Sequence, residues 1–193
     1  FNSICKEYGI TTSETHILST TNPYCFTASD EHNNLLRATT STMAAIIGGC
    51  NEINVLGFNN NSSGNNNKNE AIRLAVNIQH ILKYESFLDK VKDASSGAHY
   101  IENLTKVMME EAWKLVLEIE EKGGYFKALE SGFIHQLIQQ NHSQNVKDVA
   151  DGKKVIVGIN KYQNKNQTSA SPKDIPMASK EYELHQNTKE VNS

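Results

Sequence analysis

The chain lacks both the basic excess and the long apolar run that would place it on nucleic acid or in a membrane. Its 193 residues carry 19 Lys and Arg against 22 Asp and Glu, a formal net charge of −3. Proteins that bind a phosphate backbone carry a basic excess. No apolar stretch approaches the roughly 18 residues that a transmembrane helix requires. With 38% hydrophobic residues, the composition predicts one globular domain with a single core.

Cysteine is scarce, and its spacing suggests no pairing. The three thiols, Cys5, Cys25 and Cys50, are far apart, and the sequence has no CxxC motif and no Cys/His pair at metal-ligand spacing. We therefore expect no disulfide framework and no metal site. We also expect a reducing compartment, the cytosol or the matrix, and of these we predict the cytoplasm. The chain begins at Phe1 without a Met or a signal peptide, and residues 1–8 have the pattern of a helix end. This pattern predicts a chain that starts inside a larger protein.

Apolar residues recur at helical spacing in four segments. The clearest lies at 99–122, where apolar side chains are 3, 4, 4, 3 and 4 residues apart. The others run from an N-cap at Asp30 to the Gly48-Gly49 stop, from an N-cap at Asn69 to about residue 82, and over 125–140. The residues expected on the apolar faces are Leu35, Leu36, Met43, Ile46, Ile47, Ile72, Ala75, Ile78, Leu82, Ile101, Leu104, Met108, Leu115, Ile119, Phe126, Leu129, Phe133, Leu137 and Ile138.

Four short runs have strand character, at 15–20, 53–58, 87–92 and 154–158. Strands and helices alternate along the chain, and such βα units predict a parallel sheet with helices on its outside. A complete eight-unit barrel needs roughly 250 residues. Four strands therefore leave two architectures open, a small open α/β sheet or half of a barrel.

Two polar segments interrupt or follow this pattern. Residues 59–69 contain seven Asn and predict a solvated loop. After Asn160 the sequence turns polar and loses its periodicity. We expect one domain over 1–160 and a polar tail over 161–193 that is disordered or packed on a neighbour.

Three segments carry a more specific pattern. They read DEHNNLLRATT at 30–40 with AAIIGG at 44–49, RLAVNIQHIL at 73–82 with ES at 85–86, and DASSGAHYIE at 93–102 with AW at 112–113 and EIEEKGG at 118–124. In this order they resemble the DPYxNxLRTT…AxxGG, RIARNxQxxLxxES and DPAGGSYYxE…AW…EIExxGG segments of the methylmalonyl-CoA mutases. The similarity in order and spacing extends over residues 4–160.

The resemblance implies the second half of a (β/α)₈ TIM barrel for residues 1–160. In the family, acyl-CoA runs along the barrel axis and adenosylcobalamin sits across the C-terminal ends of the strands. The cofactor carries the radical isomerisation of methylmalonyl-CoA and succinyl-CoA, and the protein positions and shields it. Polar strand residues such as Thr15, Ser19, Thr20 and Asn54 suit a barrel lined for a ligand.

Two departures from the family pattern imply a loss of catalytic equipment. Catalytic chains carry a strand that resembles RIHCQTSG, whose His faces the substrate thioester, and counting back from Asp30 places Leu18 at that position. His16 lies on the same strand face, about 6.6 Å away along the strand. The catalytic HTN of the next strand corresponds to Asn54-Val55-Leu56, and nothing after Asn160 resembles the DxHxxG signature of the family's corrinoid domain.

Because Leu18 occupies the position of the family's catalytic His, we assign no catalytic residue. His16 is the one candidate that could replace that His. A buried, hydrogen-bonded strand His is the alternative reading of His16. The residues expected to face substrate or cofactor are His16, Thr20, Asn54, Asn77 and Gln79. Asn77 and Gln79 match polar family positions, but polar helix residues are more often solvated. Arg37 is expected in an ion pair on a helix flank.

The resemblance implies a small, non-catalytic subunit that supports a catalytic homologue in a heterodimer. Adenosylcobalamin would then belong to the complex and would not bind this chain alone. The chain would be part of an isomerase and inactive by itself. Two alternatives remain, a fragment of a catalytically active acyl-CoA mutase and a non-enzymatic α/β binding module.

Overall fold

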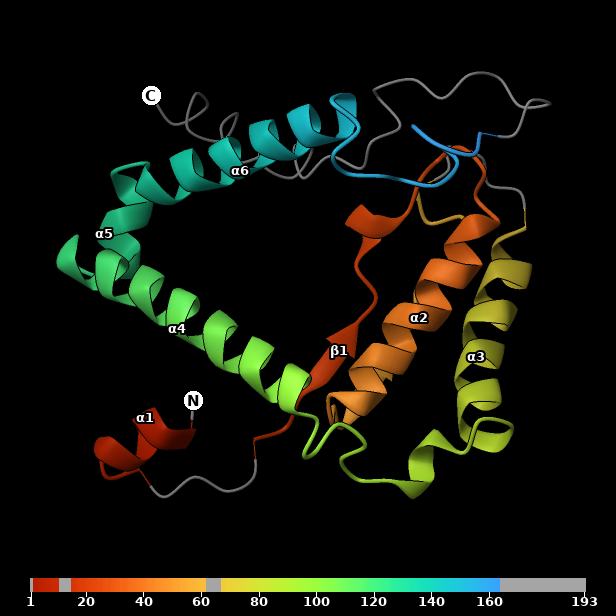
Figure 1. Ribbon diagram of the computed structural model, residues 1–193, viewed down its shortest axis with the longest axis horizontal. Coiled ribbons are helices and arrows are strands. Elements are labelled where there is room, and N and C mark those ends of the chain that lie inside the picture. Colours follow the sequence, from red (N-terminus) through yellow and green to blue (C-terminus); the bar gives the residue numbers. More distant parts are fainter. Residues whose placement is uncertain (1, 11–14, 62–66, 164–193) are drawn as a thin grey trace.

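The fold is described from a computed structural model, which defines residues 2–10, 15–61 and 67–163. The described elements follow one another along the chain and are shown in Figure 1. They are α1 (Asn2–Glu7), β1 (Leu18–Thr20), the 3-10 turn η1 (Pro23–Cys25), α2 (Asn33–Ile47), β2 (Glu52–Asn54), α3 (Lys68–Tyr84), the 3-10 turn η2 (Leu88–Lys90), α4 (His99–Glu121), α5 (Tyr125–Glu130) and α6 (Phe133–Ala150).

β1 and β2 form a parallel pair joined through α2. Leu18 lies opposite Glu52, Ser19 opposite Ile53 and Thr20 opposite Asn54. A crossover helix is the usual connection between adjacent parallel strands. The prediction of parallel strands with helices outside is therefore confirmed for this βαβ unit, and the described chain is an α/β fragment.

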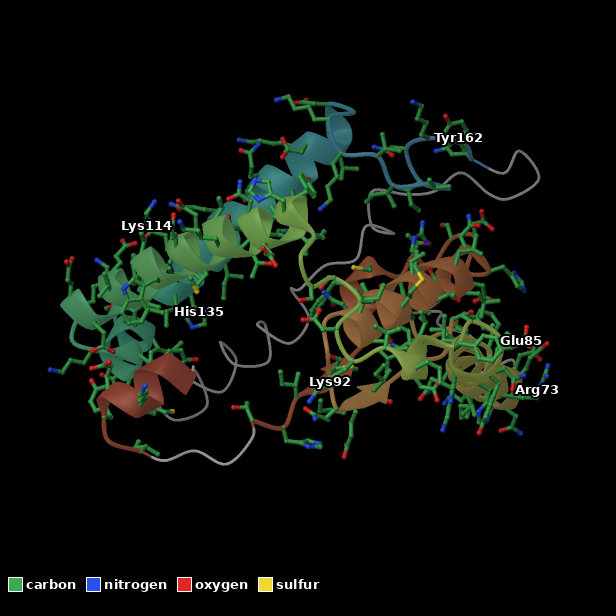
Figure 2. The ribbon with its side chains drawn as sticks, turned by 60° about the horizontal axis from the view of Figure 1, so that its bottom comes forward. Arg73, Glu85, Lys92, Lys114, His135 and Tyr162 are labelled. Atoms are coloured by element: carbon green, nitrogen blue, oxygen red, sulfur yellow. The ribbon has the colours of Figure 1, made fainter. Side chains whose placement is uncertain are left out.

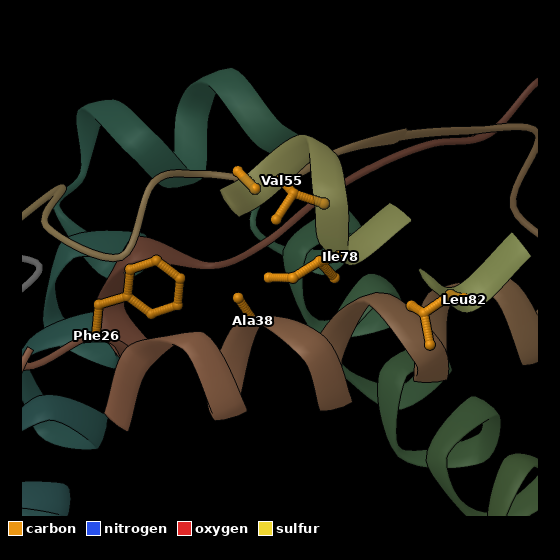
Figure 3. Close-up of a cluster of buried hydrophobic side chains, with 6 residues drawn as sticks. Phe26, Ala38, Val55, Ile78 and Leu82 are labelled. Atoms are coloured by element: carbon orange, nitrogen blue, oxygen red, sulfur yellow. The ribbon is translucent and has the colours of Figure 1, made fainter. Parts of the chain in front are cut away.

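The core lies where α2 and α3 pack together over the sheet (Figure 3). It contains Phe26, Ala38, Val55, Ala75, Ile78 and Leu82. The small side chains Ala38 and Ala75 let the two helices approach closely. Gly57, in the loop after β2, lets that loop approach α3 closely, because a Cβ there would lie 3.0 Å from the Cβ of Ala71. The predicted burial of Ala75, Ile78 and Leu82 is confirmed, whereas Ile72 is exposed.

Two predicted strands are wrong. Residues 87–92 form the turn η2, with Phe87 in the left-handed region at φ +54° and Val91 exposed. Residues 154–158 run into a turn in which the side chain of Asn160 accepts from Ile156 N and donates to Lys154 O. Those bonds take the place of a strand ladder. Within the described residues the sheet has two strands, so the expected four-stranded half-barrel is not seen there.

The arm formed by α4, α5 and α6 agrees with its predicted helical character but not with its predicted burial. α4 covers the expected 99–122 segment almost completely, yet most of its apolar residues are exposed, including Leu104 and Met108, and Ile119 is only half-buried. α5 packs on α4, and α6 turns back from α5 (Figure 1). The predicted single helix over 125–140 divides at Gly132, whose φ of +78° ends α5 and begins α6, and Phe126 is exposed rather than buried.

Of the predicted helix ends, the C-terminal stop of α2 is confirmed, whereas the N-caps predicted for α2 and α3 are wrong. The Gly48-Gly49 stop of α2 is confirmed, with Gly48 as C-cap and Gly49 at φ +79°. Asp30 is not the N-cap: it adopts φ +52°, and its carboxylate accepts a 2.5 Å bond from the Asn33 side chain. α3 begins after Asn67 rather than at Asn69. Among the helices that the structure describes, none has both the length and the apolar character that a bilayer crossing requires.

Thr42 offers a stabilising substitution in α2. Its side chain is buried, and its Oγ1 has no hydrogen-bond partner among the described residues. Because a buried, unsatisfied hydroxyl costs free energy, Thr42→Val should raise the free energy of unfolding by about 1 kcal/mol, as measured by urea denaturation. The matched control is Thr39→Val, whose hydroxyl donates to Leu35 O at 2.8 Å. That control should not stabilise the chain, and an equal gain in both variants would contradict the explanation.

Candidate functional site

The sheet carries polar side chains on the face that the helices leave uncovered. Alternation along the strands places Ser19 and Ile53, both half-buried, toward the helical layer, and Ile53 packs against the core. Alternate residues therefore project from the opposite face, which is exposed. We define the polar sheet face as His16, Leu18, Thr20, Glu52 and Asn54.

The structure brings three of the predicted site residues together on the polar sheet face. Thr20 and Asn54 lie directly opposite each other in the strand register. His16 belongs to the same alternation, two residues before Leu18, and all four side chains are exposed. Leu18 itself is 60% exposed. Their functional roles stay predictions.

His16 is paired with a carboxylate rather than buried. Its Nε2 lies 3.1 Å from Glu52 Oε1, and both side chains are more than half exposed. The alternative reading of His16 as a buried strand His is therefore wrong. A pair this exposed contributes little, because water and salt screen it.

We expect His16→Ala to change the free energy of unfolding by less than about 0.5 kcal/mol. Urea denaturation of the variant beside the wild-type chain measures this. A loss above about 1.5 kcal/mol would show that the His16–Glu52 pair supports the fold.

Asn77 and Gln79 lie apart from the polar sheet face. Both are half-buried on α3, in the helical layer on the other side of the sheet. The Gln79 side chain donates to Ala75 O at 3.4 Å, a bond within its own helix. Asn77 borders a shallow surface groove of about 280 Å³ together with His80, Ile81, Tyr84 and Glu85. The structure does not bring these two residues to the same place as His16, Thr20 and Asn54.

Asn34, which the sequence analysis did not predict as a site residue, places a buried amide at the C-terminal end of the strands. Asn34 is fully buried. Its Oδ1 accepts from Thr27 N at 3.0 Å, and its Nδ2 donates to Thr27 O at 2.9 Å and to Phe58 O at 2.8 Å. Asn34 thereby ties the loop after β1 to the loop after β2. One signal could have found it: Asn34, Ala38 and Thr42 share one buried stripe of α2 at four-residue spacing.

Arg37 bonds to neutral oxygens, so the predicted ion pair on a helix flank is not its main contact. Nη1 donates to Asn34 Oδ1 at 2.7 Å and to Thr27 Oγ1 at 3.0 Å, and Nη2 donates to Val157 O at 2.7 Å. Burial lowers the pKa of the guanidinium, and nearby Asp30 and Cys25 act in the opposite direction. Since an arginine titrates far above neutral pH, Arg37 remains a cation.

Further side-chain bonds fix the same end of the sheet. Asn61 Nδ2 donates to Pro23 O at 2.7 Å and to Phe26 O at 2.8 Å, and Leu56 N donates to Thr21 Oγ1 at 2.8 Å. The loops after β1 and β2 are thus one bonded unit. Among the described ranges, no three His, Cys, Asp or Glu residues gather in a group that could hold a metal ion.

Comparison with known proteins supports the resemblance. The family model described as methylmalonyl-CoA mutase matches residues 1–193. A methylmalonyl-CoA mutase small subunit of Porphyromonas gingivalis is 37% identical over 158 residues, which cover 82% of this chain and 25% of that protein. The methylmalonyl-CoA mutase of Escherichia coli is 32% identical over 74% of the chain and 20% of its own length. The mitochondrial enzyme of Bos taurus is 35% identical over 74% of the chain and 19% of its length.

The chain thus spans about a quarter or less of the length of these relatives. Its match to the family model nevertheless extends over the whole sequence. The resemblance drawn from the three sequence segments is confirmed: this chain belongs to the methylmalonyl-CoA mutase family.

Proposed function

We propose that this chain is part of an adenosylcobalamin-dependent methylmalonyl-CoA mutase, in the small subunit that supports a catalytic homologue. The observation that carries the proposal is Leu18 on the polar sheet face. By the resemblance, a catalytic chain has there the His that faces the substrate thioester. A Leu side chain can neither donate nor accept a proton or a hydrogen bond, so Leu18 cannot perform that role.

The arrangement of the strands and helices supports the proposal that they form part of a barrel wall. In such a wall, helices cover one side of parallel strands and the other side faces the axis. β1, α2, β2 and α3 have this arrangement, with Ile53 toward the helices and Thr20 and Asn54 on the open side. We propose that residues 1–160 form the second half of a TIM barrel and that 161–193 form a separate tail, which lies mostly outside the described residues.

Adenosylcobalamin, when bound, would supply the radical chemistry of the isomerisation. The polar side chains described at the C-terminal ends of the strands do not fit a binding site for this cofactor, because their polar atoms are already bonded. The side chains of Asn34, Asn61 and Thr21 bond to the chain's own backbone. We therefore propose that the complex, and not this chain alone, binds the cofactor.

The proposed partner is a homologous catalytic subunit, which would form a heterodimer with this chain. The support is the relative in Porphyromonas gingivalis, whose name designates it a small subunit. Exposed apolar residues on α4, such as Leu104 and Met108, leave room for protein contacts. The free thiols of Cys5, Cys25 and Cys50 fit the reducing cytoplasm that we propose.

The proposal is tested by copurification and turnover. The chain is expressed alone and together with the catalytic homologue of the same organism, and each preparation is assayed with adenosylcobalamin and methylmalonyl-CoA. We expect no succinyl-CoA and no bound corrinoid with the chain alone, and both with the copurified complex. Tight corrinoid binding or turnover by the chain alone would favour the alternative of a catalytically active mutase fragment.

A second arm asks whether the polar sheet face takes part in the chemistry. In the complex, His16→Ala should leave kcat within about twofold of wild type, because the proposal places the reaction in the other subunit. The matched control is His80→Ala, since His80 is exposed on α3 away from the sheet. A fall in kcat of more than about tenfold in His16→Ala alone would give this chain a catalytic residue and overturn the subunit role.

A further inference from the structure

A segment near the end of the described chain crosses the start of α2. After α6 the chain passes beside the first turns of α2, as the blue segment of Figure 1 shows. We define residues 155–161 as the strap. Arg37 Nη2 donates to Val157 O at 2.7 Å, a contact between residues 120 positions apart in the sequence. This bond joins the strap to the loops at the C-terminal end of the sheet.

The backbone conformation of the strap allows it to approach the start of α2 closely. Gly158 adopts φ +83°, and a Cβ at this position would lie 3.3 Å from Asp30 Oδ2 and 3.4 Å from Asn33 Nδ2. Ile159 is buried. Gly158 N donates to Lys161 O at 2.8 Å, and Ile159 N donates to Ile156 O at 3.0 Å. A left-handed glycine at a close approach is a position that other residues occupy only with strain.

The contacts of Arg37 require a guanidinium. One nitrogen serves Asn34 and Thr27, which hold the loops after β1 and β2, and the other reaches the strap. A planar fork with several fixed donors can satisfy acceptors in two directions, whereas a lysine ammonium is a single point. The half-buried setting of Arg37 strengthens these charge-assisted bonds.

We propose that Arg37 is a positioning residue that fixes the strap across the C-terminal ends of β1 and β2. Ligand sites of parallel α/β folds lie at this end of the strands. The strap is then a fixed wall of whatever site forms there, held in register with the two loops by one side chain. The proposal rests on the contacts of this chain and is independent of its role as a small subunit.

The experiment is hydrogen–deuterium exchange on the full chain, followed by mass spectrometry of peptides across the sequence. In Arg37→Ala, amides of the strap should exchange about tenfold faster, while those of α3 and α6 exchange as in wild type. Arg37→Lys should give a smaller rise, because the charge remains but the fork is lost. The control is Arg73→Ala, whose side chain is exposed on the outer side of α3 (Figure 2) and should leave the strap unchanged.

A second variant keeps the test independent of Arg37. Gly158→Ala should also accelerate exchange in the strap alone, because a Cβ there would press on Asp30 and Asn33 at the start of α2. Combining it with Arg37→Ala should add little, because both substitutions loosen the same attachment of the strap to this end of α2. Unchanged strap exchange in Arg37→Ala would overturn the proposal. A uniform rise over α2, α3 and the strap would overturn it as well, since Arg37 would then support the whole fold rather than position one segment.

Discussion

Replacing Phe26 with Ala should lower the free energy of unfolding by about 3–5 kcal/mol. Phe26 is 1% exposed and packs in the core cluster with Ala38, Val55 and Ile78 (Figure 3). Truncation removes the transfer free energy of the ring and leaves a cavity that neighbouring Ala side chains are too short to fill. Urea denaturation followed by circular dichroism measures the loss as a lower midpoint at an unchanged slope.

The chain provides its own control for the Phe26 variant. Phe126 has the same side chain but is 78% exposed on α5. Phe126→Ala should change the free energy of unfolding by less than about 0.5 kcal/mol. Equal losses in both variants would mean that the core described here does not carry the stability of the chain.

Helices were predictable from the sequence because their signal is local. The spacing of Ala75, Ile78 and Leu82 identifies both the helix and its buried face in α3. In α4 the same kind of spacing gives the helix correctly, but Leu104 and Met108 remain exposed. Periodicity shows that a face is apolar, whereas burial depends on which surface meets it.

Strands were less predictable because a strand exists only with a partner. The runs at 87–92 and 154–158 have β-prone composition, yet neither lies beside another strand in the described ranges. In the first run Lys90 N donates to Phe87 O, and the second run bonds to the side chains of Asn160 and Arg37. Composition reports the preference of single residues, and pairing is a tertiary property.

The candidate site was predictable in part. Strand alternation from His16 to Thr20 gives the open face correctly, and the register places Asn54 opposite Thr20. The pairing of His16 with Glu52 could not be foreseen, since it joins side chains whose proximity depends on strand register. Asn77 and Gln79 match polar family positions, but they belong to α3, in the helical layer on the other side of the sheet.

The first family-like segment has a structural role in this chain. Within residues 30–40, Asn34 and Arg37 are the side chains that bind the loops after β1 and β2 and the strap. Their position at the start of α2 places them directly behind the C-terminal ends of both strands. A pattern that identifies the family here therefore also fixes the loops at the C-terminal ends of the two strands.

Replacing Asn34 with Ala should lower the free energy of unfolding by about 3 kcal/mol. Asn34 is 0% exposed, and its amide serves Thr27 N, Thr27 O and Phe58 O. Removal leaves these backbone groups without their side-chain partner in a place that water does not reach, and Arg37 loses an acceptor. The loss should appear in urea denaturation.

Two further variants separate the hydrogen bonds of Asn34 from its volume. Asn34→Asp has nearly the same shape and keeps the oxygen that accepts from Arg37, but a second oxygen then faces the carbonyls of Thr27 and Phe58. The attraction between the new carboxylate and the Arg37 guanidinium offsets part of that cost, so we expect a destabilisation of about 2 kcal/mol. Asn103→Ala, at an exposed position of α4, should stay within about 0.5 kcal/mol of wild type. If Asn34→Asp were as stable as wild type, the hydrogen bond from the Asn34 amide to Phe58 O would not be what holds the two loops together. Other contacts would then have to join the loops after β1 and β2.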